Sequence, residues 1–350
     1  MARVLHVLPH RGGGAETYID LLEGFGGGFE HERVALSAGR TPASAVMSIP
    51  RGYPALARAV RRADVVHAHG DAAAVLALPL LARRTSLWTT HGLHLVRRRR
   101  SVAPGVRAAI RASRVTLCTS QTERDELAQL APGIVQRLVV ARNGLPPASA
   151  PDAAARAAAR AALQLPDATT VALFLGELER RKGPLDAAAA ARRIRDGGAP
   201  LLLLVAGTGP QADAVAREGG EAVRMLGFRD DVEQLLAAAD VFVLPSAREG
   251  LSFALLEAMR AALPIVVADG PGNAEALGEA GIVVPAGDRA SLAVALTRLA
   301  RDPAERRRLG AAAHERVARE FTAERLRNDV RSAYERALTG PVRGGDDAPA

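Results

Sequence analysis

The sequence predicts an α/β protein with two Rossmann-like domains, each built around a parallel sheet. First, the chain opens with an apolar strand (Ala2 to Pro9), a glycine-rich turn and a helix (Glu16 to Glu23). Second, short apolar runs and helical segments then alternate, which is typical of parallel strands joined by crossover helices. Third, a Pro- and Ala-rich segment interrupts this alternation, which begins again after it. The interruption divides the chain into two domains.

The expected strands of the first domain are short runs rich in β-branched and aromatic residues. They lie at residues 2–9, 31–38, 64–68, 86–90 and 114–119, and a further apolar segment covers residues 138–144. A second helix is expected at Gln121 to Leu130. We expect this domain to span residues 1–148 and a linker to span residues 149–166.

The second domain is expected at residues 167–321 and repeats the pattern. Its strands are expected within residues 170–178, 201–209, 222–226, 240–245, 264–269 and 281–288, and a helix at Leu185 to Arg195. A long charged helical end (Ser291 to Leu338) follows, and the Gly-, Asp- and Pro-rich tail at residues 339–350 is expected to be disordered.

Composition limits the class of protein. The chain has 350 residues, of which 48% are hydrophobic and 3% aromatic, so Ala, Leu and Val must fill the two cores. Cys118 is the only cysteine, which rules out an internal disulfide and suits a reducing compartment. We find neither a signal peptide nor an apolar run near the ~20 residues of a membrane span. These features predict a soluble, cytoplasmic protein.

The net charge of +8 is unevenly distributed. Nine arginines and no acidic residue lie between Arg83 and Arg114. Nucleic acid is not expected as a partner, because helix-turn-helix spacing, zinc-finger spacing and interleaved aromatic residues are missing. An anionic membrane surface, such as the inner face of the plasma membrane, or a lipid-linked acceptor would suit this run. A solvated arginine-rich face is the alternative. The residues concerned are Arg97, Arg98, Arg99 and Arg100.

The candidate site centres on residues 241–264. A buried strand (Val241 to Leu244) ends at Pro245, Glu249 lies in the loop that follows, and Glu257 lies on the next helix. If all eight steps were helical, the two carboxylates would be about 12 Å apart, roughly the length of a nucleotide sugar from hexose to ribose. Each carboxylate can accept two hydrogen bonds from a diol. The amides between them would favour a phosphate, as helix N-termini do; they belong to Gly250, Leu251 and Ser252.

The alternative for this stretch is an amphipathic helix with solvated glutamates. It suits Glu257 poorly, because the neighbouring residues Leu255, Leu256, Ala258 and Met259 are apolar.

The run EGLSFALLE (Glu249 to Glu257) resembles the Glu-x7-Glu motif of the retaining glycosyltransferase family 4. The resemblance covers Met1 to Leu338. It implies the GT-B fold, with two facing Rossmann-like domains, the active site between them, and a last helix at residues 322–338 that returns to the first domain. It also implies transfer of a sugar from a UDP- or GDP-sugar to an acceptor with retention of configuration. No essential metal or other cofactor is implied, since the nucleotide sugar is a substrate.

The resemblance extends to the donor-binding loops of the second domain. GELERRKG (Gly176 to Gly183) is similar to the family's phosphate-binding loop, and Lys182 matches its lysine. Lys182 is also the only lysine in the chain, beside 45 arginines, and Arg does not freely replace a compact ammonium. Glu177 stands where the family has an arginine, so Arg180 or Arg181 is the expected replacement. The loop that resembles the base pocket consists of Gly207, Thr208 and Gly209.

In the first domain, Gly13 and Gly14 match the family's Gly-Gly loop, and Glu16 follows them. His91 matches the histidine of the Thr-x-His-Gly motif, which faces the donor sugar, and His69 is a second candidate on the acceptor side. The catalytic residues implied are therefore Glu249, Lys182 and His91. A zinc site is conceivable but not expected, because the rest of the pattern is not that of a metallohydrolase. Its ligands would be His67, His69, His91, His94 and Cys118.

Two alternatives to this enzyme remain. A catalytically weak nucleotide-sugar-binding protein on the same scaffold would explain Glu177. A GT-B epimerase is the other, while a phosphorylase is disfavoured because Lys182 leaves no further lysine for pyridoxal phosphate.

Overall fold

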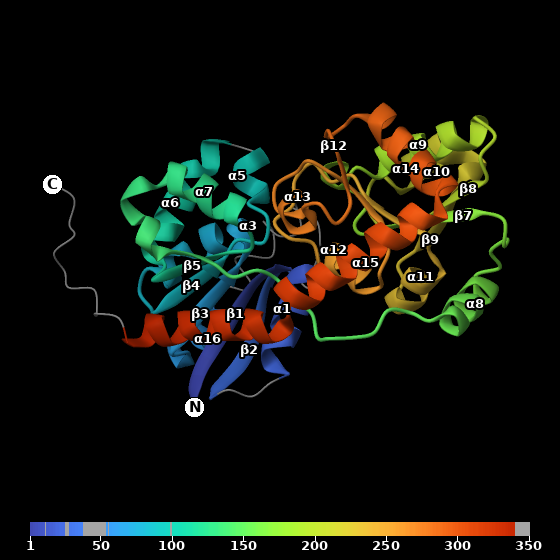
Figure 1. Cartoon of the computed structure of the whole chain (residues 1–350). Coiled ribbons are helices and arrows are strands. Elements are labelled where there is room, and N and C mark those ends of the chain that lie inside the picture. The colour runs from blue at the N-terminus through green and yellow to red at the C-terminus, as the bar shows by residue number, and fades with distance from the viewer. Residues whose placement is uncertain (11, 25–27, 38–53, 55, 99, 340–350) are drawn as a thin grey trace. The chain divides into compact units, whose positions relative to one another are not determined.

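The computed structural model describes residues 1–339, apart from residues 11, 25–27, 38–53, 55 and 99. The chain forms two compact units. One consists of Met1–Arg142 and the segment from Glu324 onwards, and the other consists of Asn143–Ala323. In Figure 1 each unit has its own sheet with helices packed around it.

The N-terminal unit contains a six-stranded parallel sheet in the order β2-β1-β3-β4-β5-β6. Its strands are β1 (Ala2–His10), β2 (Phe29–Ser37), β3 (Val65–His69), β4 (Ser86–Thr89), β5 (Val115–Cys118) and β6 (Leu138–Val140). Its helices include α1 (Gly14–Glu23), α3 (Gly70–Leu76), α4 (Leu78–Leu81), α5 (His94–Arg98), α6 (Ala103–Ala112) and α7 (Gln121–Leu130). The core between them is mainly aliphatic, and the largest fully buried side chains among the described residues of this unit are Trp88, Tyr18 and Tyr334.

The C-terminal unit contains a second six-stranded parallel sheet in the order β12-β11-β10-β7-β8-β9. Its strands are β7 (Thr170–Leu175), β8 (Leu201–Ala206), β9 (Val223–Gly227), β10 (Val241–Leu244), β11 (Ile265–Ala268) and β12 (Ile282–Val284). Its helices are α8 (Ala153–Ala162), α9 (Pro184–Asp196), α10 (Ala212–Gly219), α11 (Val232–Ala238), α12 (Phe253–Arg260), α13 (Asn273–Leu277), α14 (Arg289–Arg301) and α15 (Pro303–Glu320). The two parallel sheets confirm the predicted fold class.

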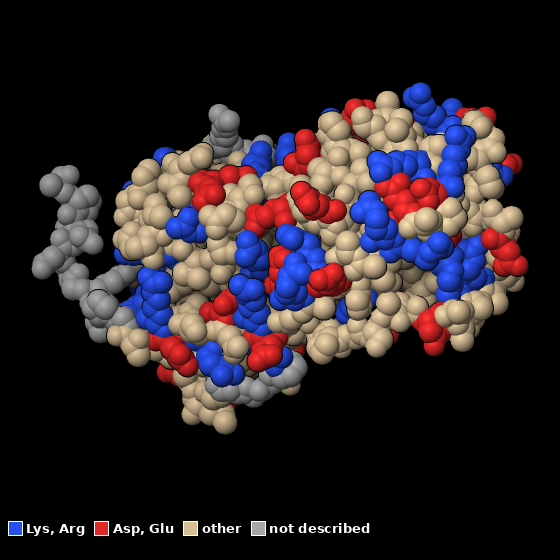
Figure 2. All heavy atoms as spheres, viewed as in Figure 1, with Lys and Arg blue, Asp and Glu red and all other residues tan. Residues whose placement is uncertain are grey.

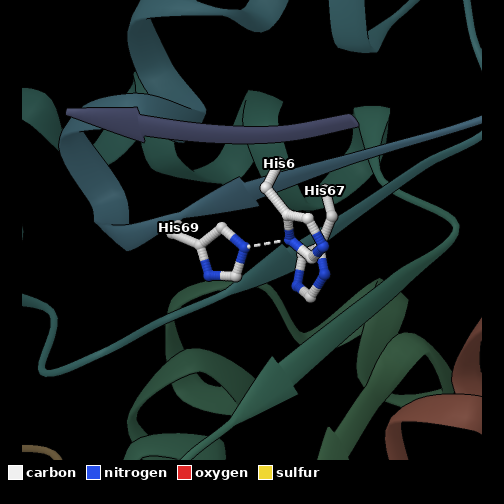
Figure 3. Close-up of side chains that lie close together, drawn as sticks. All are labelled: His6, His67 and His69. Carbon is white, nitrogen blue, oxygen red and sulfur yellow. Dashed lines mark hydrogen bonds between the residues drawn. The ribbon is translucent and has the colours of Figure 1, made fainter. Parts of the chain in front are cut away.

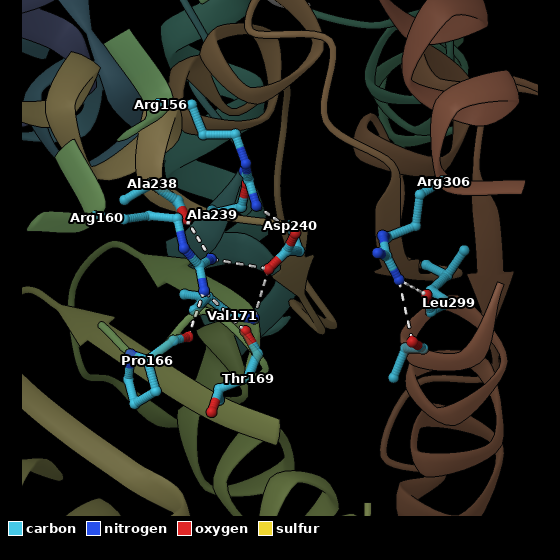
Figure 4. A network of polar contacts seen from close by, with 11 residues as sticks. Arg156, Arg160, Pro166, Thr169, Val171, Ala238, Ala239, Asp240, Leu299 and Arg306 are labelled. Atoms are coloured by element: carbon cyan, nitrogen blue, oxygen red, sulfur yellow. Dashed lines mark hydrogen bonds and ion pairs between the residues drawn. The ribbon is translucent and has the colours of Figure 1, made fainter. Parts of the chain in front are cut away.

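The segment expected to be a linker contains helix α8, which belongs to the C-terminal unit. Asp152 caps its first turn by accepting a hydrogen bond from the amide of Ala155 at 2.8 Å. Arg156 and Arg160 on this helix bind the carboxylate of Asp240 at 2.6 and 3.2 Å (Figure 4). These contacts, beside a pocket of about 630 Å³, attach the segment to the start of β10.

The boundary between the units falls before Asn143, whereas we expected it at residue 148. The reason is a pair of backbone hydrogen bonds of 2.9 Å that join Leu145 to Phe321 and Ala323. They hold residues 143–148 on the C-terminal unit.

The charged C-terminal end, which we expected to be helical, consists of three helices. Asp302 caps α15, and Pro303 occupies its first turn, which separates it from α14. The last helix, α16 (Ala323–Thr339), then packs on the N-terminal unit, where the hydroxyl of Tyr334 lies 2.8 Å from Nδ1 of His67. The predicted return of this helix to the first domain is therefore confirmed. The tail at residues 340–350 lies outside the described residues.

Candidate active site

The candidate site of the C-terminal unit lies in loops that follow neighbouring parallel strands. Lys182 is in a short 3-10 turn after β7, and Glu249 is in the loop after β10, the next strand in the sheet. The two loops are packed closely at Gly183, whose φ is +71° and where an added Cβ would lie 2.4 Å from the carbonyl oxygen of Pro245. Carboxyl ends of parallel strands are where such sheets bind ligands.

Lys182 and Glu249 form an ion pair within these loops. Nζ of Lys182 lies 2.5 Å from Oε1 of Glu249, and the two side chains are only 13% and 7% exposed. Nη1 of Arg181 lies 3.2 Å from the same carboxylate oxygen. Two of the three predicted catalytic residues are therefore in contact.

Arg181, the expected substitute for the missing family arginine, is bound by carboxylates. Its Nη2 lies 2.6 Å from Glu177 and its Nε lies 2.9 Å from Glu179, in addition to the contact with Glu249. We expected Arg181 to bind the donor, but three carboxylates already neutralise its guanidinium. In this arrangement Arg181 links Glu177 to Glu249.

Glu257 lies on α12 and is half-buried. Burial raises the pKa of its carboxyl to about 7, although Arg260 partly opposes this shift. Among the residues that the structure describes, none is hydrogen-bonded or ion-paired to this carboxyl group. Glu249 lies in the loop, as expected, and helix α12 begins only at Phe253, so the spacing of about 12 Å for eight helical steps does not apply.

The amides before α12 are not all free. Ser252 donates its amide hydrogen to Oδ1 of Asn273 at 3.0 Å, which corrects our expectation that this amide binds a phosphate. The carbonyl oxygen of Leu251 accepts a hydrogen bond from Nδ2 of Asn143 at 2.7 Å. For Gly250 and Leu251, the amide hydrogens have no partner among the described residues. Asn273 and Asn143 were not on our list of site residues.

Glycines allow the remaining donor loop to approach its neighbours. Gly207 has a φ of +143°, and an added Cβ there would lie 1.9 Å from the carbonyl oxygen of Gly176. A Cβ on Gly209 would lie 2.7 Å from that of Leu178. Thr208 accepts a hydrogen bond from the amide of Leu178 at 2.9 Å through its carbonyl oxygen. The loops after β7 and β8 are thus packed backbone to backbone.

In the N-terminal unit, Gly13 precedes α1 and has a φ of +83°, which only glycine adopts without strain. Gly14 is the first residue of the helix, and Glu16 lies in its first turn. The amide of Glu16 donates to the carbonyl oxygen of Gly13 at 3.0 Å.

His91 lies two residues after the end of β4 and has a left-handed φ of +51°. The preceding residue fixes this turn, because Oγ1 of Thr90 donates to the buried carboxylate of Glu123 at 2.5 Å. Burial lowers the pKa of His91 to about 4, so its ring is neutral at pH 7. Nε2 of His91 lies 3.0 Å from Nδ1 of His69, which brings the two predicted histidines together.

Three buried histidines, His6, His67 and His69, offer ring nitrogens that lie within 4.8 Å of one another (Figure 3). Imidazole is a common zinc ligand. However, both ring nitrogens of each histidine already have hydrogen-bond partners, so the geometry describes a hydrogen-bond network. His6, a member of this network, was not expected from the sequence. A polar residue inside the apolar run of the first strand was the available signal.

One arginine of the basic run, Arg97, is held in an ion pair. Nε and Nη2 of Arg97 both lie 2.9 Å from the carboxylate of Glu126, and the arginine side chain is only 12% exposed. Arg97 is thus unsuited to bind an anionic surface. Nothing is described of the side chains of Arg98, Arg99 and Arg100. On the face shown in Figure 2, basic and acidic side chains are intermixed on both units.

Similarity to known proteins extends over both units. The family described as Glycosyltransferase Family 4 matches residues 12–149, and that described as Glycosyl transferases group 1 matches residues 169–302. Glycogen synthase of Mycobacterium tuberculosis is 31% identical over 304 residues, which are 80% of this chain and 70% of the relative. The chain belongs to glycosyltransferase family 4.

Other proteins are similar to this glycosyltransferase over most of their length. The 2-deoxystreptamine N-acetyl-D-glucosaminyltransferase of Streptomyces fradiae is 32% identical over 313 residues, which are 80% of this chain and 73% of the relative. The crystal structure of Anabaena HepE in complex with UDP-glucose has a TM-score of 0.78 at 19% identity and covers 96% of this chain and all of HepE. The chain is therefore a glycosyltransferase with the GT-B fold.

Within the described residues, no helix is long and apolar enough to cross a bilayer.

Proposed function

We propose that this glycosyltransferase moves a hexosyl group from a UDP- or GDP-sugar to an acceptor, with retention of the anomeric configuration. The observation that carries the proposal is the Lys182–Glu249 ion pair in the loops after β7 and β10. A cation held there can neutralise the charge that develops on the leaving diphosphate. The motif supports retention only through the family resemblance.

Different residues of the C-terminal unit would bind different parts of the donor. The Lys182 ammonium and the amides of Gly250 and Leu251 would bind the diphosphate. Glu249 would accept hydrogen bonds from the hexose hydroxyls, and the unpaired carboxyl group of Glu257 would accept those of the ribose. Gly207, Thr208 and Gly209 would line the base. The proposed site uses no metal, because the Lys182 ammonium and these amides would supply the positive charge.

From the N-terminal unit, Gly13 and Gly14 would approach the donor, and His91 would contact the bound sugar. Glu16 would lie on the acceptor side, whereas His69 is fully buried and would act only through its contact with His91.

The relatives support a nucleotide-sugar donor but not one acceptor. HepE was crystallised with UDP-glucose, and the names of other relatives describe glycogen, 2-deoxystreptamine and phosphatidyl-myo-inositol as the molecules that they make or modify. We propose a glycan, small-molecule or lipid-linked acceptor. An anionic membrane surface would be bound by Arg98, Arg99 and Arg100. Changing these three residues to Glu, with Arg97 kept, should abolish co-sedimentation with anionic vesicles; unchanged sedimentation would remove the idea.

A weak binding protein remains the second candidate function, favoured by the position of Glu177. Its carboxylate lies 2.6 Å from Arg181 and adds negative charge close to the expected diphosphate. Micromolar donor binding without sugar transfer to any acceptor would favour this candidate. Epimerised product from donor alone would indicate an epimerase.

The single lysine allows a direct test of the proposal. An amine-reactive reagent can modify only Lys182 and the N-terminal amino group. We expect a bound nucleotide sugar to protect Lys182, measured by mass spectrometry, while the N-terminal amino group reacts as before. UDP-glucose, GDP-mannose and other donors should be compared, and the protecting donor then tested for transfer. If Lys182 is labelled equally in the presence and absence of each donor tested, its assignment to the donor site is contradicted.

A further inference from the structure

Four histidines form a continuous chain of hydrogen bonds in the N-terminal unit. Nε2 of His91 lies 3.0 Å from Nδ1 of His69, and Nε2 of His69 lies 2.8 Å from Nδ1 of His6. Nε2 of His6 then lies 2.9 Å from Nδ1 of His31. These distances are those of N–H···N hydrogen bonds.

The chain crosses the sheet, because its members come from or lie just after four neighbouring strands, β4, β3, β1 and β2. The parallel register makes it diagonal: His6 is level with His67, whereas His31 is level with Val4. It therefore leads from His91, at the carboxyl edge of the sheet, to the half-buried His31 on the edge strand. There His31 lines a surface pocket of about 180 Å³, together with Glu30 and Glu32.

All four rings are neutral at pH 7. Burial lowers the pKa of His6, His69 and His31, and that of His91 to about 4. A neutral imidazole has one N–H donor and one acceptor nitrogen. Every bond of the chain joins an Nε2 to an Nδ1. All four rings can therefore carry the proton on Nε2, or all on Nδ1, and both arrangements satisfy the three bonds.

The charges around the chain differ between its ends. Arg33 on β2 lowers the pKa of His6, His69 and His31, and its guanidinium is paired with Glu23 and Asp20 of α1. Glu23 raises the pKa of His31, so the carboxylate favours a proton at the surface end. Within the described part of the chain, no group is hydrogen-bonded to Nδ1 of His91. Both ends of the row of hydrogen-bonded histidines, at His91 and at His31, are thus open to a proton donor or acceptor.

We propose that these histidines are a proton relay between His91 and the surface at His31. The inference rests on the proposed sugar transfer, in which the acceptor oxygen bonds to the anomeric carbon and the bond to the diphosphate breaks. The proton of the acceptor hydroxyl goes to Nδ1 of His91. The Nε2 proton of each ring then passes to Nδ1 of the next, and His31 releases its Nε2 proton to water. One proton enters and one leaves. After the products have left, the opposite shift restores the first tautomers: water protonates Nε2 of His31, each Nδ1 proton passes back to Nε2 of the preceding ring, and Nδ1 of His91 releases its proton to water.

His67 supplies a matched control. It is also fully buried and lies beside His6 in Figure 3. Its ring nitrogens lie 2.8 Å from the hydroxyl of Tyr334 and 2.7 Å from Oγ1 of Thr89, so it is outside the chain. A change at His67 disturbs the same core without interrupting the relay.

The hydrogen bonds between the four histidines can be tested without an activity assay, by NMR of protein labelled with ¹⁵N-histidine. We expect four neutral rings at pH 7 and scalar couplings across the three N–H···N bonds. His6→Gln should remove the couplings to His69 and His31. If wild-type protein lacks these couplings, the proposal is overturned.

The transfer rate at saturating donor tests the function of the chain. Gln can keep a hydrogen bond but cannot relay a proton, so His6→Gln should lower the rate at least about tenfold with unchanged donor affinity. His31→Ala should also be slow, and imidazole should restore its rate in proportion to its concentration. His67→Gln should transfer within about threefold of wild type and should not respond to imidazole. Wild-type rates in His6→Gln, or no response of His31→Ala to imidazole, would overturn the relay.

Failure of the proposed function has a different signature. If no nucleotide sugar protects Lys182 and wild-type protein transfers no sugar, sugar transfer is wrong, and the relay is judged on the NMR couplings alone.

Discussion

Lys182 and Arg181 share one oxygen of Glu249, at 2.5 and 3.2 Å. An ion pair that is largely withdrawn from water is stronger than one on the surface, and each partner depends on the other. A diphosphate that binds the ammonium must compete with this carboxylate. In the proposed site, Glu249 would therefore position the lysine before the donor arrives and would set how tightly the donor is held.

Lys182→Gln should weaken binding of the donor that protects Lys182, by roughly 10- to 100-fold, since a hydrogen bond to a charged group contributes about 1.5–3 kcal/mol. Arg181 remains to neutralise Glu249, so the melting temperature should change little. Titration calorimetry measures the affinity. Lys182→Arg is the matched control because it keeps the charge but replaces the compact ammonium with a planar fork. Wild-type affinity in Lys182→Gln would contradict the role of Lys182.

Gly272 should be essential for the shape of the Glu249 loop. An added Cβ at Gly272 would lie 1.1 Å from the carbonyl oxygen of Gly250. Gly287 provides the comparison, because its φ of +78° is close to the +80° of Gly272 but nothing lies within 4 Å of its added Cβ. We expect Gly287→Ala to cost about 1 kcal/mol of unfolding free energy from backbone strain alone. Gly272→Ala should cost several times more and lose donor binding. Denaturant unfolding measures the unfolding free energy of both variants. Equal losses would show that the loop can shift to accommodate a Cβ at Gly272.

The sequence was sufficient for the alternation of strands and helices, because each parallel strand is a short apolar run between turn residues. It also singled out Lys182, because the sequence alone shows that this is the only lysine. The contacts between site residues that are far apart in the sequence were harder to predict. Asn273 and Ser252 are 21 positions apart, and His6 and His69 are 63 apart, so only the sheet register and loop packing bring them together.

The pairing of Arg181 was hidden for a related reason. Its position suggested a phosphate ligand, but Glu177 and Glu179 lie within hydrogen-bond reach in the same turn. A list of charges along the chain cannot state which of them neutralise one another. That depends on the conformation of the loop.

Asp240 should be a major contributor to the stability of the C-terminal unit. It binds Arg156 and Arg160 and accepts a hydrogen bond from the amide of Val171 at 2.8 Å (Figure 4). Asp240→Ala leaves the buried guanidinium of Arg160 without its counter-charge and should cost about 3–5 kcal/mol. Thermal unfolding measures this loss.

Asp167 is the control for Asp240, because it lines the same pocket but is exposed. Asp167→Ala should change stability by less than about 0.5 kcal/mol. A similar loss in both variants would mean that net charge, and not the buried pairs, stabilises this region. Donor binding should be unchanged in both.

Glu257 should make donor binding depend on pH near neutrality. Burial raises the pKa of its carboxyl to about 7, above the ordinary value for Glu, so the folded state holds this proton more tightly than the unfolded state. Its contribution to stability is therefore complete in acid and is lost as the pH rises towards 7. Donor binding has the opposite dependence, because only the ionised carboxylate accepts both ribose hydroxyls. The affinity should rise about tenfold between pH 6 and pH 8.

The measurement is titration calorimetry with an intact nucleotide sugar, whose esterified diphosphate does not titrate in this range. Glu257→Gln is isosteric and cannot ionise, so it should bind more weakly and with no pH dependence. Arg260 and Glu233, which also affect the pKa of Glu257, are retained in this variant. If wild type and Glu257→Gln show the same pH profile, Glu257 does not bind the ribose and its high pKa reflects burial alone.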